Sequence, residues 1–171
     1  MLLSAGCLAT TLSLCKESET AFAVARLLPY EVATRVDVPR PEGGKLLSMC
    51  LDRRGDSDRL VVRIGMPDHI EVEVEASRSK RFETLRREDH KNFGRQVVSM
   101  RHDKKVYCIY LPIGQGKGIG LDVFSDEYPW QWMDRLFSGT DRDLEYRVDY
   151  EPSVENRVRA LLRPARLTRC M

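Results

Sequence analysis

The segment VYCIYLPIGQGKGIGLDVF, residues 106–124, places two apolar runs on either side of a tract rich in glycine. Both faces of the first run carry apolar or aromatic side chains. A strand that is covered on both sides is typical of the centre of a sheet. We therefore expect a central pair of strands here, joined by the glycine tract, with the rest of the chain packed against it.

The glycine tract itself has three interpretations that stay open. It forms a mobile loop between two strands, a phosphate cradle, or a contact in an oligomer, because backbone without side chains allows close approach. It matches neither the Walker A pattern nor the dinucleotide-binding pattern of glycines. The residues that would make this loop contact are Gly114, Gly116, Lys117 and Gly118.

Further strands are predicted on both sides of this segment. The run HIEVEVE, residues 69–75, alternates apolar and acidic side chains with the period of two that strands have. Similar patterns of apolar and β-branched residues predict strands at 30–38, 46–51, 60–64, 97–100, 106–113, 119–124 and 144–150.

Three helices complete the predicted fold, over residues 16–28, 126–137 and 153–163. In the second of them, Trp130, Met133 and Phe137 follow helical spacing and are expected in the core. The segment 77–91 has few apolar residues and reads as an exposed helix or an ordered loop. We therefore expect an α+β fold, with one mostly antiparallel sheet of about six to eight strands and three helices packed on it.

The composition fits one folded domain over residues 1–171, with 165–171 as a basic tail. Apolar residues make up 42% and charged residues 32% of the chain, which is neither a disordered nor a membrane composition. Residues 1–15 are apolar and uncharged, but they lack a positive start and fall short of the roughly 20 residues that cross a bilayer. We interpret them as part of the core, and a targeting segment stays the alternative.

Five cysteines, at positions 7, 15, 50, 108 and 170, form no closely spaced pair and no cluster with zinc spacing. An odd number without a framework of spacings favours reduced, buried thiols and a cytoplasmic location. The sequence predicts no metal and no cofactor.

Positive charge gathers in two segments, although the net charge is only +2. Residues 78–105 hold ten lysines and arginines against four acids, and residues 157–171 hold five arginines and no acid. We expect the two segments to lie near each other and to bind a polyanion or an acidic protein face. The candidate binding residues are Arg86, Arg87, Lys91, Arg101, Lys104, Lys105, Arg157, Arg159 and Arg163.

Histidines in the first basic segment offer a catalytic alternative. His90 and His102, with Lys104 beside the second, have the chemistry for acid–base cleavage of RNA. Surface histidines in polar loops are the competing interpretation. The sequence thus leaves catalysis uncertain and favours its absence.

The function that we expect is a non-catalytic protein-interaction or assembly module, acting in an oligomer or as a subunit of a complex. The alternative is an RNA-binding protein or a ribonuclease that uses segments 78–105 and 157–171 with His90 and His102. A protein partner or self-association ranks first because the chain has no nucleic-acid-binding motif and little excess charge.

Overall fold

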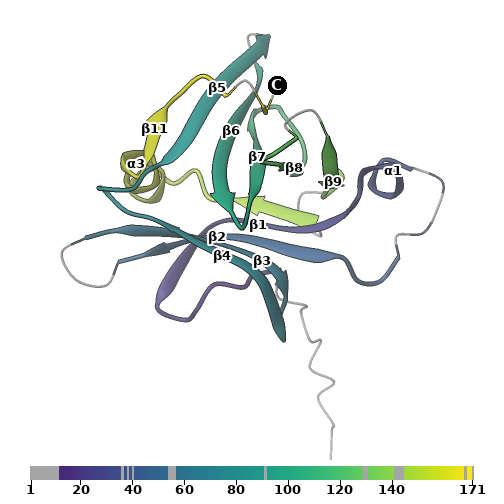
Figure 1. Cartoon of the computed structure of the whole chain (residues 1–171), viewed down its shortest axis with the longest axis horizontal. Coiled ribbons are helices and arrows are strands. Elements are labelled where there is room, and N and C mark those ends of the chain that lie inside the picture. Colours follow the sequence, from purple (N-terminus) through teal and green to yellow (C-terminus); the bar gives the residue numbers. More distant parts are fainter. Residues whose placement is uncertain are drawn as a thin grey trace, which may run out of the picture.

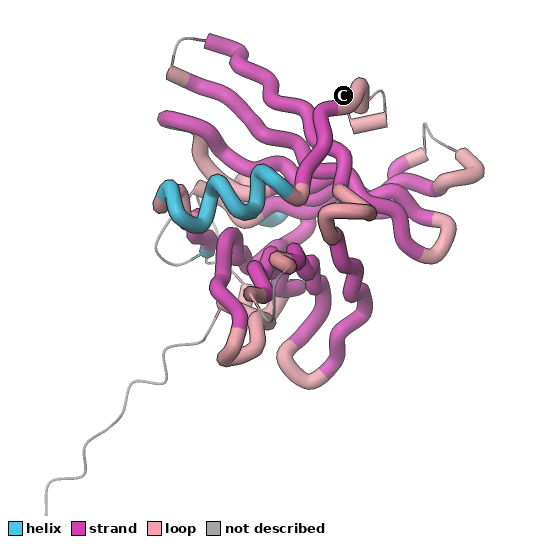
Figure 2. Tube along the Cα trace, turned by 90° about the vertical axis from the view of Figure 1, so that its left-hand side faces the viewer, coloured by secondary structure: helices cyan, strands magenta, loops and turns pink. Residues whose placement is uncertain are grey.

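The computed structural model describes residues 12–35, 37, 39, 41–53, 57–90, 92–128, 131–140, 145–167 and 169–170, with only the backbone at 88–90. Within these ranges eleven strands form one nearly closed, barrel-like sheet (Figure 1). Two short helices accompany the sheet in the described part of the chain, and strands dominate the trace (Figure 2).

The strands are β1 (Glu19–Pro29), β2 (Lys45–Asp52), β3 (Arg59–Met66), β4 (His69–Ala76), β5 (Phe82–His90), β6 (Phe93–His102), β7 (Lys105–Gly114), β8 (Gly120–Ser125), β9 (Trp132–Phe137), β10 (Tyr146–Val148) and β11 (Leu162–Pro164). The helices are α1 (Tyr30–Ala33) and α3 (Pro152–Ala160).

Strand β1 joins the two halves of the sheet. The strand order is β11-β5-β6-β7-β8-β9-β1-β2-β3-β4, and β10 pairs with β1 outside this path. β1 pairs with β2 and β10 over most of its length, and with β9 at Leu28 and Pro29. All of these pairings are antiparallel, whereas β11 runs parallel to β5. The sheet curls until β4 approaches β6, which encloses a core between the two halves.

Strand β7 is covered on both sides, which confirms its predicted central place. Its inward-facing residues Ile109 and Leu111 belong to the main core inside the sheet. Its outward-facing Val106 and Cys108 belong to a second, smaller core with Leu167. The residues that cover this outer face are 165–167 and 169–170, which we call the strap.

The predicted α+β fold is wrong, because two of the three expected helices are strands. Residues 16–28 fall largely in β1, whose sequence ETAFAVARLLP is buried on both faces. An apolar run without alternation fits a buried helix or a doubly covered strand equally well, so periodicity did not separate them. The expected strand at 30–38 begins instead with the single turn of α1.

The expected helix at 126–137 is also a strand over its second half. Residues 132–137 form β9, where Trp132 and Met133 are exposed and Leu136 is buried. The helical spacing was therefore a coincidence, and Trp130 lies outside the described residues. Residues 82–90 form β5 rather than a helix or loop. The third helix is confirmed as α3, and β11 follows it.

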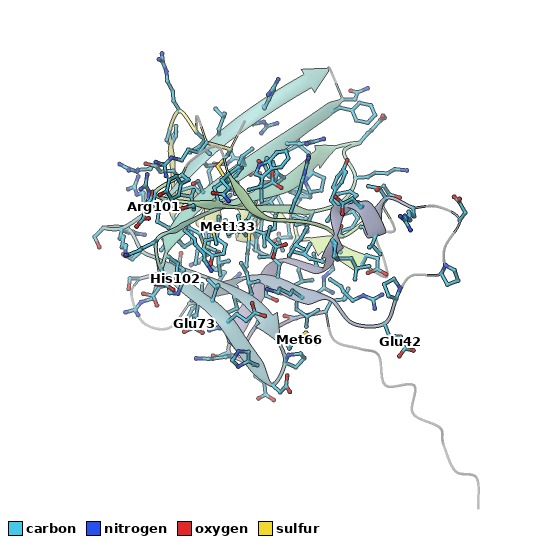
Figure 3. All side chains as sticks on the ribbon, turned by 45° about the vertical axis from the view of Figure 1, so that its right-hand side comes forward. Glu42, Met66, Glu73, Arg101, His102 and Met133 are labelled. Carbon is cyan, nitrogen blue, oxygen red and sulfur yellow. A yellow bond between two sulfur atoms is a disulfide. The ribbon has the colours of Figure 1, made fainter. Side chains whose placement is uncertain are left out.

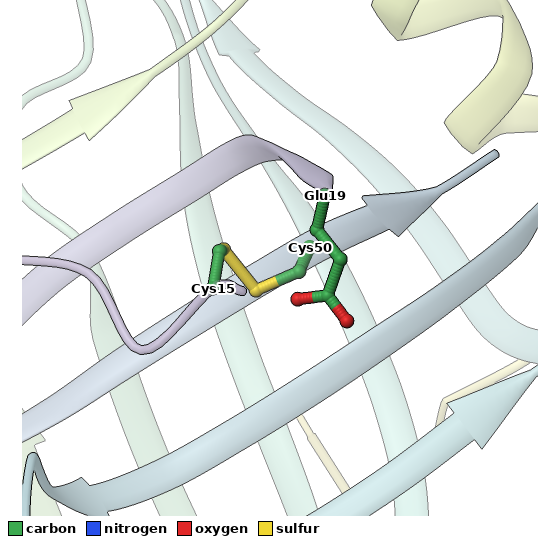
Figure 4. Close-up of side chains that lie close together, drawn as sticks. All are labelled: Cys15, Glu19 and Cys50. Carbon is green, nitrogen blue, oxygen red and sulfur yellow. A yellow bond between two sulfur atoms is a disulfide. The ribbon is translucent and has the colours of Figure 1, made fainter. Parts of the chain in front are cut away.

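Two disulfides replace the expected free thiols. Cys15 bonds to Cys50, and Cys108 bonds to Cys170. The first tethers the segment before β1 to β2, beside the side chain of Glu19 (Figure 4). The second ties the strap to β7. Cys7 lies outside the described residues, as do residues 1–11 and thus most of the segment 1–15 that was expected in the core.

A buried ion-pair network fixes β1, β3 and β4 to one another. The Arg63 guanidinium donates hydrogen bonds of 2.6 and 3.0 Å to the two carboxylate oxygens of Glu19. It also donates to Glu73 at 2.6 Å. The side chains of Arg63 and Glu19 are only 4% and 1% exposed, so each charge depends on the other for compensation.

Candidate functional site

A groove lies on the outer face of β5–β9, and we call it the outer groove. Its volume is about 590 Å³. Strands β7 and β8 form its floor at Tyr110 and Asp122, and β9 contributes Trp132 and Arg135. The strap closes one end at Cys170, and the glycine tract contributes Gly116, Lys117 and Gly118.

An arginine held between two aromatic rings dominates one wall of this groove. The guanidinium carbon of Arg135 lies 4.5 Å from the ring centre of Tyr30 and 4.7 Å from that of Trp132. Such stacking attracts the cation to the rings and keeps its planar group in one orientation. Trp132 is nevertheless 56% exposed, so the stacked group faces solvent.

The carboxylate of Asp122 lies at the floor of the groove, and Asp122 is opposite Arg135 in the β8–β9 register. One oxygen of this carboxylate is 3.6 Å from Nε of Arg135, and the Asp122 side chain is 10% exposed. Burial raises the pKa of Asp122, and the charge of Arg135, a hydrogen bond with Tyr110 and the charge of Arg95 offset this only in part. Burial, the charge of Asp122 and the same hydrogen bond raise the pKa of Tyr110.

The strap is held on the groove by several interactions besides its disulfide. The Tyr110 hydroxyl donates to the backbone oxygen of Cys170 at 3.0 Å. The backbone N–H of Ala165 donates to Thr84, and Arg169 pairs with Asp126 at 2.5 Å. Leu167 is buried against the outer face of the sheet. The strap therefore forms a fixed wall.

The glycine tract is packed rather than mobile at its centre, contrary to one expectation. Gly118 is buried and adopts a φ of +80°, where side chains are unfavourable. The neighbouring Ile119 N–H donates to the Ser138 hydroxyl at 2.8 Å, and the Ser138 N–H donates to the Ile119 carbonyl. Gly116, Lys117 and Gly118 line the outer groove, whereas Gly114 and Gly116 line a second hollow at the mouth of the barrel.

Replacing Gly118 with alanine should lower the free energy of unfolding by about 2–4 kcal/mol, from a strained φ and from crowding. An added Cβ would lie 2.5 Å from the Gly139 carbonyl oxygen and would also overlap the Phe137 ring. Gly43 is a matched control, because its φ is +100° but no atom lies within 4 Å of an added Cβ. Urea denaturation should give Gly43→Ala a loss of only about 1–2 kcal/mol. Equal losses for both variants would show that the tract has room to move.

The predicted basic residues lie close together in part, but most of them pair with acids. The two basic segments are neighbours where β11 pairs with β5. The ion pairs are Arg101–Asp126, Lys104–Glu127, Arg157–Asp58, Arg159–Glu155 and Arg163–Glu83. Arg87 lines the outer groove, Arg86 lines the hollow at the barrel mouth, and Lys91 lies outside the described residues.

The two predicted catalytic histidines are not brought together. His90 pairs with Phe93 at the start of β6, and His102 ends the same strand. Nine residues of extended chain separate these positions by about 30 Å. His102 instead lines a small hollow of about 220 Å³ between the two halves of the sheet, with Lys105 and Met133; Figure 3 labels His102 and Met133. Lys104, beside it in the turn, pairs with Glu127.

One group of potential metal ligands occurs in the described part of the chain, namely Cys15, Glu19 and Cys50. Both sulfur atoms are bonded to each other, and the Glu19 carboxylate accepts from Arg63. A thiolate is the form of cysteine that binds metals, so this group does not offer a metal site in its oxidised state.

Sequence reasoning missed Arg135, Asp122, Arg95 and Tyr30 as parts of one site. The pairing of Asp122 with Arg135 follows only from the β8–β9 register. The sequence pattern predicted a helix at 126–137, so it did not predict this register. Trp132 and Tyr30 both stack on Arg135, but they lie about a hundred residues apart in the chain, so the sequence did not connect them.

Comparison with known proteins does not assign the chain to a family, so the class of protein is described from the structure. The chain matches no protein-family model, no curated protein and no solved structure. The described residues include no helix that is both long enough and apolar enough to cross a membrane. Fold and site together define a barrel-like β domain with a cationic, aromatic groove on its outer face.

Proposed function

We propose that the protein is a non-catalytic interaction module that binds an exposed segment of a partner protein in the outer groove. The observation that carries this proposal is Arg135 stacked between Tyr30 and Trp132. Tryptophan, tyrosine and arginine are the residue types enriched at binding hot spots. Stacking orders these side chains before a partner arrives, so binding costs less conformational entropy.

The surroundings of the stacked arginine support the same proposal. Phe93 is exposed on another wall of the same groove, and Trp132 is exposed beside the arginine. Exposed aromatic side chains that line one groove are typical of interfaces rather than of solvated surfaces. The partner is either another protein or a second copy of this chain, and the mass of the purified protein in solution separates the two.

The RNA-binding alternative has less support from the geometry. Aromatic rings and arginine also suit single-stranded RNA. However, five of the predicted phosphate-binding residues pair with the protein's own acids. The two histidines of the proposed nuclease site lie far apart, because His90 ends β5 opposite the start of β6 and His102 ends β6.

Selection from a displayed library of random peptides tests the proposed function. Peptides enriched on the wild-type protein should bind the Trp132→Ala variant at least tenfold more weakly, as loss of a hot-spot residue predicts. Trp132 is exposed, so its truncation should leave the fold intact. The matched control is Met66→Ala, an exposed side chain at the β3–β4 turn, which should bind the peptides as the wild type does.

Failure of this selection has two distinct forms. If no peptide is enriched while a single-stranded RNA binds with strong salt dependence, the RNA-binding alternative replaces the proposal. If enriched peptides bind Trp132→Ala as tightly as wild type, the interaction surface lies elsewhere on the molecule.

A further inference from the structure

We infer that the ligand of the outer groove is an acidic peptide segment, whose carboxylates meet Arg95, Lys117 and Arg135 while an apolar side chain packs against Trp132. This inference rests on the proposed function and names the chemical class of its partner.

The charge balance of the groove is the first argument. The cations Arg95, Lys117 and Arg135 line it, against the one carboxylate of Asp122. In the described part of the chain, Arg95 and Lys117 form no ion pair. Elsewhere the protein neutralises its surface arginines with its own acids, as at Arg157 and Arg163. The groove therefore keeps a positive charge that an anionic ligand would complement.

The orientation of Arg135 is the second argument. Its Nε faces Asp122 at 3.6 Å, and its planar group is held between two rings. A guanidinium has five N–H donors in a fixed fork, so its remaining donors are free of that contact and suit a carboxylate in two-point binding. The adjacent Trp132 ring offers an apolar surface to the next side chain of an extended segment.

The carboxylate at the floor of the groove favours a peptide over a nucleic acid. Asp122 repels phosphate groups, which a nucleic acid presents at every nucleotide. A peptide instead brings backbone N–H groups, for which a carboxylate is a strong acceptor. An acidic peptide thus matches both the cationic walls and the acceptor at the floor.

The test uses the peptides selected on the wild-type protein, with their affinities measured by fluorescence anisotropy at pH 7.5. The selected peptides should be rich in aspartate and glutamate, and replacing these by asparagine and glutamine should weaken binding at least tenfold. Arg95→Gln removes one positive charge of the groove and should weaken binding about fivefold, the effect of one charge near 4 Å in water. Lys117→Gln should weaken binding by a similar factor.

Arg59→Gln is the matched control, because Arg59 is an exposed cation on β3, away from the groove. It changes net charge by the same amount as Arg95→Gln and should leave affinity unchanged. Circular dichroism and thermal unfolding establish that each variant is folded. Selected peptides that are neutral or basic, or Arg95→Gln and Lys117→Gln variants that bind as tightly as the wild type, would overturn the inference and leave the proposed function standing. A selection that enriches no peptide would overturn both.

Discussion

Replacing Arg63 with methionine should lower the free energy of unfolding by about 3–5 kcal/mol. Methionine keeps an unbranched side chain in the same space, but it leaves the Glu19 carboxylate buried without its cation. The Glu19 side chain is only 1% exposed and accepts hydrogen bonds of 2.6 and 3.0 Å from the Arg63 side chain, besides one of 2.8 Å from the backbone N–H of Lys16. Urea denaturation of both proteins, followed by circular dichroism, measures the difference.

Two control variants separate this effect from a general loss of charge. Arg59 lies on the same strand and pairs with Glu75 at the surface, so Arg59→Met should cost less than about 1 kcal/mol. Combining Arg63→Met with Glu19→Gln removes the stranded charge and should restore part of the stability. A loss below about 1 kcal/mol in Arg63→Met would show that water reaches Glu19.

The pH dependence of this variant follows from the pKa of Glu19. Burial alone would raise that pKa, but the hydrogen bonds from the Arg63 side chain, the hydrogen bond from the Lys16 backbone and the charges of both residues lower it below 4.5 in the folded protein. The wild type therefore loses the stability that ionised Glu19 contributes beside Arg63 as the pH falls through 4.5 and below. In Arg63→Met burial dominates and raises the pKa, so protonation of Glu19 should stabilise the variant as the pH falls.

Replacing Cys108 and Cys170 together with serine should lower the free energy of unfolding by roughly 4 kcal/mol, according to the loop-closure model. Their disulfide joins residues 62 positions apart and ties the strap to β7. Without it, the unfolded chain gains freedom, and Val106 and Phe124 lose part of their cover. Denaturation of the wild type with a reductant should give a loss at least as large, because both disulfides are then open.

The second disulfide supplies the control for this prediction. Cys15 and Cys50 are 35 positions apart, so their serine pair should cost only a few tenths of a kcal/mol less in the same model. Losses of unfolding free energy below about 1 kcal/mol for both serine pairs would contradict a structural role of the disulfides.

Disulfides are rare in a reducing cytosol. A count of free thiols in the protein from its native source tests the predicted cytoplasmic location.

The sequence predicted those strands that alternate or that carry β-branched residues. β4 alternates three apolar residues with three glutamates, and β7 is apolar on both faces, and both were found. β1 is rich in alanine and leucine, which are good helix formers, and only pairing with three other strands makes it extended. Tertiary contacts, not local preference, decide the structure there.

The candidate site was less predictable than the strands. Its glycine tract was visible in the sequence as an unusual feature, but the stacked arginine was not. Three elements meet there, because Tyr30 starts α1, Asp122 lies on β8 and Arg135 lies on β9. Such a site depends on cross-strand register, and register follows from the whole sheet rather than from any single segment.

The pairing of β1 with β9 and β10 also constrains how the chain folds. β1 spans residues 19–29, whereas its partners lie at 132–137 and 146–148. Contacts between residues so distant in sequence require a large loop to close first, and such topologies fold slowly. During synthesis β1 can pair with β2, but the barrel cannot close until β10 has left the ribosome. We therefore expect the nascent chain to hold its core partly open through most of its translation, when it would most need a chaperone.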